Sequence, residues 1–597
     1  MSSAAGRIVE VNGPIVTVEL PQVAMGEQVR VGELALTGEV IGRDAGRAIV
    51  QVYESTEMLA PGQRADPLGH PLAAELGPGL LQNIFDGLQR PLTAILKQSG
   101  DRITRGLAVP SLDRERHWHF VPLAGIAAGS TVAGGSVLGT VAETDTVVHR
   151  ILVPPDAGGE LVEIAAEGDY DVEQVIARVR RRDGAVQPLR LYHRWPVRRA
   201  RPYVSRDEAG VPLITGQRVL DTFFPLLKGG KAAVPGAFGA GKTMVQQQIA
   251  RWSDAGIMIY LGCGERGNEL AEILETFPLL TDPHTGRLLM ERTLLVANTS
   301  NMPVVAREVS IYMGVTIAEY YRDQGYDVVL VADSISRWAE ALREVAGRLG
   351  QMPAEEGHPA YLASRLVAFY ERAGRVQTLA GRSGSVSLIG AVSPPGGDFS
   401  EPVTSHTKEI VQVFWALSKD LADARHYPAI DWTESYSEYV PAAAGWWAEN
   451  VDPDWAVRRA EALGLLHQSD ELARIVNLVG PEALSAGQRW VLEGAALVKE
   501  GLLQQSALDE VDSFCSPQRQ FALLDLLLGI YREGEDLITA GVPVQRLLQL
   551  PLLARARRAR SAYSNSELDG LKAFAADIRS TCEALRLEYA AQKERPA

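Results

Sequence analysis

The feature that most constrains the fold is a glycine-rich run in the middle of the chain, at residues 236–243. Its letters, GAFGAGKT, fit the pattern G-x-x-x-x-G-K-[ST] at every fixed position. An apolar segment, KAAVP, precedes the run, and TMVQQQIARW, which is typical of an amphipathic helix, follows it. A phosphate-binding P-loop requires this order of strand, glycine loop and helix. The context therefore predicts an α/β nucleotide-binding domain and disfavours the alternative, a chance glycine turn.

Each part of the run has a predicted role in binding ATP or ADP. Glycines let backbone N–H groups turn toward phosphate oxygens, where a Cβ would obstruct the approach. Lys242 is expected to reach the terminal phosphates, and the Thr243 hydroxyl to ligate Mg²⁺. The helix that follows adds the positive end of its dipole. The predicted nucleotide-binding residues are Gly236, Ala237, Phe238, Gly239, Ala240, Gly241, Lys242 and Thr243.

Two carboxylates stand after apolar segments farther along the chain. Asp333 ends VVLVAD, and Glu265 follows IMIYLGCG. Parallel α/β sheets bind ligands at the carboxyl ends of their strands. Asp333 could therefore hold Mg²⁺, while Glu265 could activate a water and Arg266 could neutralise phosphate charge. Two structural alternatives stay open, a helix N-cap for Asp333 and a helix N-terminal acid, paired with Arg266, for Glu265.

The chain divides into stretches with different periodicity. Residues 1–70 contain short β-type segments punctuated by Gly and Pro, which predict a small barrel or sandwich. Residues 115–190 are again β-rich and indicate an inserted domain. Segments 71–114 and 191–440 alternate between strand and helix patterns, which favours a parallel sheet with covered faces. Residues 441–597 have helical periodicity and predict a helical C-terminal domain.

Composition limits the function classes. A net charge of −15 argues against a dominant nucleic-acid surface. A local basic stretch leaves a nucleic-acid-binding surface open as an interpretation, although a solvated or subunit-facing surface is favoured. It consists of Arg178, Arg180, Arg181, Arg182, Arg190, Arg194, Arg198, Arg199 and Arg201. Three cysteines in 597 residues are typical of a reducing, cytoplasmic compartment. Without a signal-like start or a long apolar run, membrane association is expected only through partner proteins.

Long segments of the chain resemble the catalytic A subunits of V-type and archaeal-type rotary ATPases. The resemblance is carried by WPVRRARP (195–202), PLITGQRVLDTFFPLLKGG (212–230), GAFGAGKT, YLGCGERGNEL, MPAEEGHPAYLASRL and SPPGGDFSEPVT, and by the long run from LMERTLLVAN to EVAGRL. It covers nearly the whole chain. It implies an N-terminal β-barrel, an inserted bulge domain, a RecA-like P-loop domain and a helical C-terminal domain.

The resemblance also implies roles and partners. Lys242, Glu265 and Arg266 would be catalytic, Thr243 and Asp333 would lie on the magnesium side, and the rings of Phe414 and Phe514 would flank adenine. An alternating A3B3 ring with B-type non-catalytic subunits would supply an arginine finger. Central and peripheral stalk subunits would connect the ring to a membrane sector that moves protons or sodium. The chain would therefore sit on the cytoplasmic face of a membrane.

Three positions depart from the family pattern. Ala240 replaces the P-loop cysteine of eukaryotic vacuolar enzymes, so a disulfide switch at the P-loop is excluded. Ser418 stands where Asp is usual, and SHTKEI (405–410) differs from the usual Gln-Asn-Thr form.

Three rival functions are weighed against this one. A Rho-type nucleic-acid motor shares barrel, RecA-like core and P-loop, but the insertion and the acidic charge speak against it. A non-catalytic scaffold protein of the same ring usually loses the P-loop Lys or the Glu, and both Lys242 and Glu265 are present. A secretion-type export ATPase lacks the long insertion. The direction of the reaction and the identity of the ion are not encoded in this chain.

Overall fold

A computed structural model describes residues 5–44, 46–100, 103–208, 210–283 and 285–593. The chain separates into two compact units. The first contains Met1–Glu208, Lys228–Lys231 and Ala255–Val411, and the second contains Ala209–Leu227, Ala232–Asp254 and Gln412–Ala597. Over the described part of the chain, no helix has both the length and the apolar character that crossing a membrane requires.

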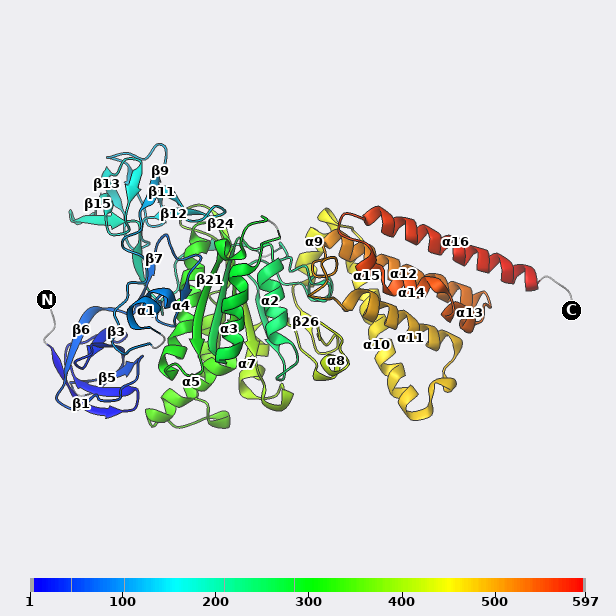
Figure 1. Cartoon of the computed structure of the whole chain (residues 1–597), viewed down its shortest axis with the longest axis horizontal. Helices are drawn as coiled ribbons and strands as arrows, with labels where there is room; N and C mark the ends of the chain where they lie inside the picture. Colours follow the sequence, from blue (N-terminus) through cyan, green and yellow to red (C-terminus); the bar gives the residue numbers. More distant parts are fainter. Residues whose placement is uncertain (1–4, 45, 101–102, 209, 284, 594–597) are drawn as a thin grey trace. The chain divides into compact units, whose positions relative to one another are not determined.

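The first unit begins with a closed six-stranded barrel (Figure 1, blue). Its strands are β1 (Gly6–Asn12), β2 (Ile15–Glu19), β3 (Glu27–Val31), β4 (Leu36–Asp44), β5 (Arg47–Val52) and β6 (Arg64–Pro71), in the order β1-β2-β5-β4-β3-β6. Alternate residues such as Val16 and Val18 on β2 are fully buried in its core, as the period of two along a strand dictates. Closure removes exposed sheet edges. Of the two predicted architectures, the barrel is therefore confirmed.

The inserted segment forms two antiparallel sheets of four strands each. One contains β9 (Trp118–Pro122), β11 (Val137–Ala142), β12 (Val148–Leu152) and β14 (Gly168–Tyr170), and the other contains β10 (Thr131–Val132), β13 (Gly159–Ile164), β15 (Val175–Arg180) and β16 (Val186–Arg190). The two chain ends that flank this insertion pair with each other as β7 (Ala73–Leu76) and β17 (His193–Pro196). The β-rich inserted domain is confirmed.

A parallel sheet forms the rest of the first unit, in the order β24-β22-β20-β21-β8. These strands are β24 (Ser383–Val392), β22 (Asp327–Asp333), β20 (Ile257–Glu265), β21 (Thr293–Thr299) and β8 (Ile84–Phe85), with β23 (Gly374–Gln377) and β18 (Ser205–Arg206) added antiparallel beyond β24. The helices are α1 (Leu92–Ser99), α3 (Gly267–Thr276), α4 (Val304–Asp323), α5 (Ile335–Arg348), α6 (Leu362–Tyr370) and α7 (Pro402–Ile410). Strands β20 and β22 are as continuously apolar as strands covered on both faces should be.

Helix α4 is buried along nearly its whole length, including its charged residues. It packs on β20, β22 and β24, and it also contacts β7 and α5. Because the helix has no solvated face, Glu308, Glu319 and Asp323 are each less than a tenth exposed. A buried charge is tolerated only when it is paired and hydrogen-bonded.

Arginines from distant segments supply the pairing. Arg201 contacts Asp323 at 2.6 Å, Arg372 pairs with Glu319, and Arg198 lies 2.8 Å from Glu308 and 2.8 Å from Glu39 of the barrel. The surface-facing interpretation of the basic stretch is therefore wrong for Arg198 and Arg201. Their role is internal, because α4 presents carboxylates that must be neutralised where they are buried.

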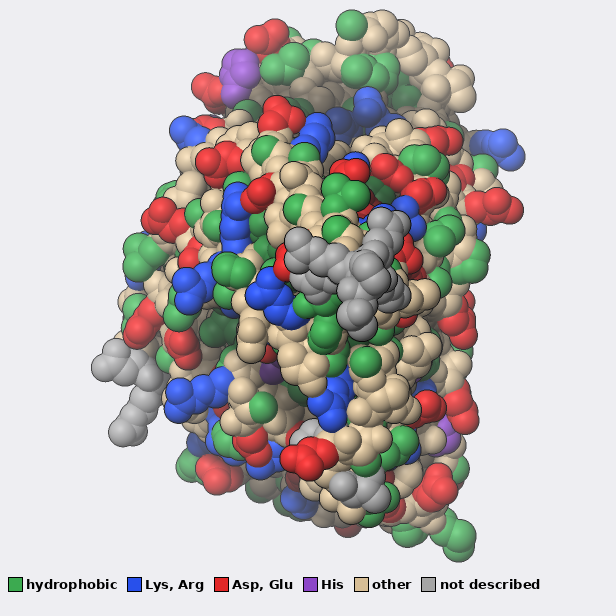
Figure 2. All heavy atoms as spheres, turned by 90° about the vertical axis from the view of Figure 1, so that its right-hand side faces the viewer, with side chains coloured by type: hydrophobic (Ala, Val, Ile, Leu, Met, Phe, Trp, Pro, Cys, Tyr) green, Lys and Arg blue, Asp and Glu red, His purple; other side chains and the backbone are tan. Residues whose placement is uncertain are grey.

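Other members of the basic stretch do face solvent. Arg178, Arg180 and Arg190 form ion pairs with Glu163, Glu160 and Glu173, in which each side chain is between two-fifths and three-fifths exposed. Exposed pairs of this kind contribute little to stability. On the face of the molecule drawn in Figure 2, acidic, basic and hydrophobic side chains are interspersed. Such a mixture does not resemble the continuous basic patch of a nucleic-acid binder.

The second unit combines three strands with a helical domain. Its strands are β19 (Lys231–Pro235), β25 (Val413–Phe414) and β26 (Tyr436–Ser437), and its short helices are α2 (Lys242–Trp252), η1 (Val219–Phe223) and α8 (Lys419–Asp423). The helical domain contains α9 (Val440–Asn450), α10 (Trp455–Val479), α11 (Ala486–Val498), η7 (Lys499–Leu503), α12 (Pro517–Thr539), α13 (Val544–Leu548), α14 (Pro551–Arg557), α15 (Ala559–Ala562) and α16 (Leu568–Lys593). In its core the rings of Trp447 and Trp455 stack with centroids 4.9 Å apart. The predicted helical C-terminal domain is confirmed.

A buried histidine of the second unit makes its stability depend on pH. His426 is 7% exposed and lies edge-on to Trp432. Burial, together with the charges of Lys499 and Arg560, lowers the pKa of His426 from 6.5 to about 4. In the unfolded chain the imidazole takes up a proton below pH 6.5, whereas in the folded chain it stays neutral. Its contribution to stability is therefore complete above pH 6.5 and is lost as the pH falls toward 4.

We expect His426→Gln to flatten this pH dependence. Between pH 6.5 and 4 the wild-type chain should lose up to about 1.4 kcal/mol per pH unit through this one group. The variant lacks that loss. Thermal unfolding midpoints recorded between pH 7.5 and 5 would measure the difference. The control is His117→Gln, at an exposed histidine; if both variants keep the wild-type slope, His426 is not responsible for it.

Candidate functional site

The glycine-rich run forms a loop that leads from β19 directly into α2. Gly239 and Gly241 have φ angles of 83° and 92°, in the left-handed region that glycine adopts without strain. Helix α2 begins at Lys242, immediately after Gly241. The Lys242 ammonium donates to the carbonyl oxygen of Gly236 at 2.6 Å. Loop and helix thus have the form predicted for a P-loop.

The first glycine is required by packing. Gly236 bridges Leu417, just beyond β25, in parallel register. A Cβ on Gly236 would lie 2.7 Å from the Leu417 Cβ, closer than two carbon atoms can approach. With the N–H groups at the start of α2, the Lys242 ammonium and the Thr243 hydroxyl, this loop provides the donor set that a polyphosphate needs.

A cavity of about 520 Å³ opens beside the loop, entirely within the second unit. Its lining residues come from the loop and α2, from the segment after α8 and from the segment after η7, with one residue from before η1 and one from α15. They are Gln217, Gly239, Gly241, Met244, Val245, Gln248, Arg425, Tyr427, Pro428, Ala429, Gln504, Gln505, Ser506, Ala507, Leu508 and Arg560. The Tyr427 side chain is partly exposed, and its ring carbons lie 3.8 Å from where a Cβ on Gly241 would be. An aromatic ring therefore stands next to the phosphate loop.

The two aromatic residues predicted to flank adenine are not among the lining residues. Phe414 is fully buried on β25 and stacks on Tyr436 with ring centroids 5.6 Å apart. Phe514 stacks on Trp252 at the end of α2, at 5.2 Å. Their assignment to the adenine site stays a prediction, and the cavity itself offers Tyr427.

A buried ion pair holds the wall of the cavity that comes from the helical domain. Arg218 and Asp512 are both fully buried, with Nη1 and Oδ1 2.7 Å apart. The Arg218 guanidinium also donates to the carbonyl oxygens of Leu502 and Gln504, each at 2.6 Å. The Gln505 backbone N–H donates to the Tyr427 carbonyl at 2.8 Å. The segment 504–508 is thereby fixed to the segment that carries Tyr427.

In the first unit the predicted carboxylates lie at one edge of the parallel sheet. β20 ends at Glu265 and β22 ends at Asp333, and Gly262 of β20 is paired with Asp333. Asp333 is 3% exposed and accepts a hydrogen bond from the Tyr260 hydroxyl at 3.2 Å. The shared edge follows from parallel pairing of consecutive apolar strands, as the sequence predicted.

The electrostatics of this edge favour a carboxyl group that can take up a proton near neutral pH. Burial, followed by the negative charges of Asp333 and Glu269, raises the pKa of Glu265 from 4.5 to about 7. A general base works best when its pKa is close to the operating pH. Glu265 is thus suited to accept a proton from a water.

The structure also decides between the alternative interpretations. The N-cap of α5 is Ser334, whose hydroxyl accepts from the Arg337 N–H at 3.4 Å, so Asp333 is not the helix cap. The acid in the first turn of α3 is Glu269, and Glu265 belongs to the strand. Asp333 therefore lacks the capping role that competed with a functional one, and Glu265 lies outside the first turn of α3. Arg266 is exposed where α3 begins.

Magnesium fits the chemistry of these groups. Mg²⁺ prefers a few carboxylate or hydroxyl oxygens together with phosphate oxygens and waters. Thr243 and Asp333 are oxygen donors of this kind. Among the residues that the structure describes, no three His, Cys, Asp or Glu side chains converge as an all-protein metal site. A magnesium that arrives with its nucleotide is compatible with both observations.

Sequence reasoning missed three contributors. Glu269 could have been found, because it lies one helical turn beyond Glu265 at the start of a helix. Tyr427 stands in a loop without periodicity, and only its neighbour Pro428 marks a turn. The pairing of Arg218 with Asp512 spans nearly 300 positions, and no local signal announces it.

Comparison with known proteins defines the family. Residues 8–69 match the β-barrel domain of the ATP synthase alpha/beta family, 109–198 its barrel-sandwich domain, 216–437 its nucleotide-binding domain and 444–548 the C-terminal domain of V and A type ATP synthases. A V-type ATP synthase alpha chain of Nitrosococcus oceani is 67% identical over 98% of this chain and 99% of its own length. The chain belongs to this family.

Two further proteins match the chain at lower sequence identity. The corresponding A subunit of the A-type ATP synthase of a Desulfurococcus species is 52% identical over 98% of this chain and 100% of its own length. Among solved structures, the assembled type III secretion ATPase EscN of enteropathogenic E. coli matches with a TM-score of 0.61 and 21% identity, covering 88% of this chain and 100% of that one. At that identity the likeness shows the fold alone. The V-type and A-type relatives, by contrast, share sequence along nearly the whole chain.

We expect Asp512→Asn to destabilise the second unit by about 3–5 kcal/mol, because it leaves the buried Arg218 without its counter-charge. The change should also weaken nucleotide binding, since segment 504–508 loses its anchor. Chemical unfolding and nucleotide titration of the same variant would measure both effects. Glu510→Gln, at an exposed acid of the same loop, is the matched control. Equal stability of the two variants would show that the ion pair does not hold the loop.

Proposed function

We propose that Lys242, Thr243, Glu265, Arg266 and Asp333 act on one bound nucleotide. The chain is a catalytic A subunit of a V/A-type rotary ATPase, which hydrolyses or synthesises ATP in connection with ion transport across a membrane. The observation that carries the site assignment is the raised pKa of Glu265, about 7, at a strand end beside Asp333. Neither carboxylate is used as a helix cap, and the P-loop has the form needed for phosphate.

Binding would be divided among the groups of the P-loop. The backbone N–H groups of 239–243 and the Lys242 ammonium would hold phosphate oxygens, and the Thr243 hydroxyl and the Asp333 carboxylate would face the magnesium. Bound magnesium supplies positive charge that offsets the charge of the transferring phosphoryl group. Arg266, exposed at the start of α3, would add a guanidinium donor to the same charge.

Glu265 would accept the proton in hydrolysis and return it in synthesis. In hydrolysis its carboxylate accepts a proton from the attacking water as the water oxygen bonds to the γ-phosphorus. The bond between that phosphorus and the β–γ bridging oxygen breaks, and ADP leaves with the bridging oxygen. In synthesis the protonated Glu265 returns the proton to the departing water. A pKa of about 7 suits both directions.

The adenine would stack on Tyr427. The cavity of about 520 Å³ adjoins Gly239 and Gly241, and Tyr427 is the aromatic residue among its lining. Gln504, Gln505 and the neighbouring apolar residues Ala507 and Leu508 would enclose the base from the other side. The assignment of Phe414 and Phe514 to the adenine site, which the resemblance implies, stays a separate prediction.

Further proteins would complete the machine. B-type non-catalytic subunits, which would alternate with this one in an A3B3 ring, would supply an arginine finger at the γ-phosphate. Central and peripheral stalk subunits would transmit rotation to the membrane sector, and through them the chain would sit at the cytoplasmic face of the membrane. Whether protons or sodium ions move would be decided by the membrane sector.

We expect Glu265→Gln to reduce turnover by roughly two to four decades while nucleotide binding stays nearly intact, because the amide cannot accept the proton. Steady-state ATPase assays of the assembled ring, together with nucleotide titration, would separate the two effects. In the control Glu269→Gln the base is retained. That variant should turn over normally. In its pH–rate profile, the fall in turnover at acid pH should move to lower pH, because a negative charge beside Glu265 is gone. Near-normal turnover in Glu265→Gln would contradict the assignment.

We expect Tyr427→Ala to weaken ATP binding by about 1–3 kcal/mol, the range measured when an aromatic ring that stacks on a base is removed. Tyr427→Phe keeps the ring and should bind ATP like the wild type. Titration of the full chain with a fluorescent or calorimetric readout would compare the three proteins. If alanine and phenylalanine behave alike, Tyr427 does not stack on the base.

A further inference from the structure

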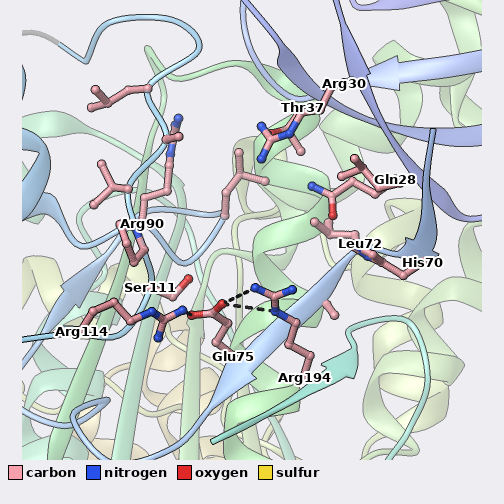
Figure 3. Close-up of a pocket in the computed structure, with 17 residues that line it drawn as sticks. Gln28, Arg30, Thr37, His70, Leu72, Glu75, Arg90, Ser111, Arg114 and Arg194 are labelled. Carbon is pink, nitrogen blue, oxygen red and sulfur yellow. Dashed lines mark hydrogen bonds and ion pairs between the residues drawn. The ribbon is translucent and has the colours of Figure 1, made fainter. Parts of the chain in front are cut away.

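A separate cavity of about 400 Å³ lies within the first unit and contains none of the residues assigned to ATP turnover. Its walls come from β3, β4 and β6 of the barrel, from β7 and β17, and from the segment 107–114 (Figure 3). The cavity therefore lies where the barrel meets the strands that flank the insertion. Its volume is within the range of small-molecule sites.

The lining is rich in cationic side chains. Arg30, Arg90, Arg114 and Arg194 line the cavity, and among the described lining residues one carboxylate, Glu75, accompanies them. This excess of positive charge stands out in a chain whose net charge is −15. A concave surface with walls of low dielectric concentrates such a field.

Two of the arginines share one carboxylate. Arg114 and Arg194 contact the two oxygens of Glu75 at 2.7 and 2.9 Å, as the dashed lines in Figure 3 show. Arg114 also reaches Glu173 at 3.0 Å. Arg194 is 55% exposed on its side chain, so it can turn part of its donor fork toward a second anion. Glu75 thus holds both guanidinium groups at the cavity, and Glu173 provides Arg114 with a second counter-charge.

Arg30 has no carboxylate partner. Its guanidinium donates to the Thr37 hydroxyl at 2.7 Å and to the Ala35 carbonyl at 3.2 Å, and no described carboxylate lies within 4.0 Å of it. Arg90 differs, because Asp86 and Glu54 neutralise it from behind at 2.7 and 3.4 Å. Arg114 is paired with two carboxylates, Glu75 and Glu173. Uncompensated charge at the cavity is therefore concentrated on Arg30, and the partly exposed Arg194 shares its carboxylate with Arg114.

We propose that this cavity binds a compact multivalent anion, a small molecule that carries phosphate or carboxylate groups. Guanidinium forks bind both groups through paired hydrogen bonds. Gln28 on β3 and Ser111 on the segment 107–114 add neutral donors, and Leu68, Leu72 and Leu88 add apolar lining for the body of such a molecule. The bound anion supplies the negative counter-charge that Arg30 lacks.

Calorimetric titration of the full chain with pyrophosphate and, separately, with citrate tests the proposal. The titration is made in a Lys242→Ala background, which weakens phosphate binding at the P-loop. We expect saturable binding of at least one probe. Preference for pyrophosphate assigns the site to phosphate compounds, and equal or tighter binding of citrate assigns it to polycarboxylates.

Two variants with opposite expected effects on affinity distinguish specific binding from a general effect of net charge or folding. Arg30→Gln should bind roughly tenfold to hundredfold more weakly, the scale of one hydrogen-bonded charge contact. Glu75→Gln should bind more tightly, because Arg114 and Arg194 no longer share the Glu75 carboxylate. Arg7→Gln is the matched control, since Arg7 is also a barrel arginine that donates to a backbone carbonyl, that of Gly62, and it is outside the cavity.

Two results would overturn the proposal. One is the absence of saturable binding of either probe in the Lys242→Ala chain. The other is binding that Arg30→Gln and Arg7→Gln weaken equally, which would show a diffuse effect of net charge. Arg30 and Arg7 are both on the barrel surface, so their variants can be compared at equal stability, which thermal unfolding verifies.

Discussion

The first unit depends on the neutralisation of charges that α4 carries into its interior. A carboxylate without a partner in such surroundings costs several kcal/mol, so the helix can pack only where guanidinium groups meet it. Arg198 pairs with Glu308 and Glu39 together, which connects the barrel to α4 through one side chain. Arg201 and Arg372 secure the C-terminal half of the helix in the same way. The positions of barrel, insertion ends and sheet within this unit are therefore set by electrostatics as much as by apolar packing.

The same helix contacts the end of β20, the strand that carries Glu265. Arg307 precedes Glu308, and its carbonyl accepts from the Cys263 thiol at 3.6 Å and from the Ser310 hydroxyl at 2.8 Å. The Arg307 side chain crosses Gly264, where a Cβ would come within 2.5 Å of Nε. Glycine at 264 is thus needed for the close approach of that side chain, one residue before Glu265. The helix that pairs with the barrel through Glu308 thus also contacts the residue before the proposed base, through Arg307.

Local sequence patterns predict much of this architecture. Alternating residues predict the barrel strands, apolar runs that end in Glu265 and Asp333 predict a shared sheet edge, and GAFGAGKT predicts loop and helix together. Each of these signals lies within about ten consecutive residues. The misjudged parts depend on contacts between distant positions. Arg198 and Arg201 look like surface residues until α4 presents its carboxylates.

The fixation of segment 504–508 by Arg218 has a consequence for how the chain can be divided. The P-loop and Tyr427 come before residue 440, whereas Gln504, Gln505 and Leu508 come from the region after η7. A fragment that stopped at the end of the sheet would retain the phosphate loop and lose half of the enclosure for the base. The cavity proposed for the nucleotide is consequently not a transferable module, because part of its lining comes from the helical domain.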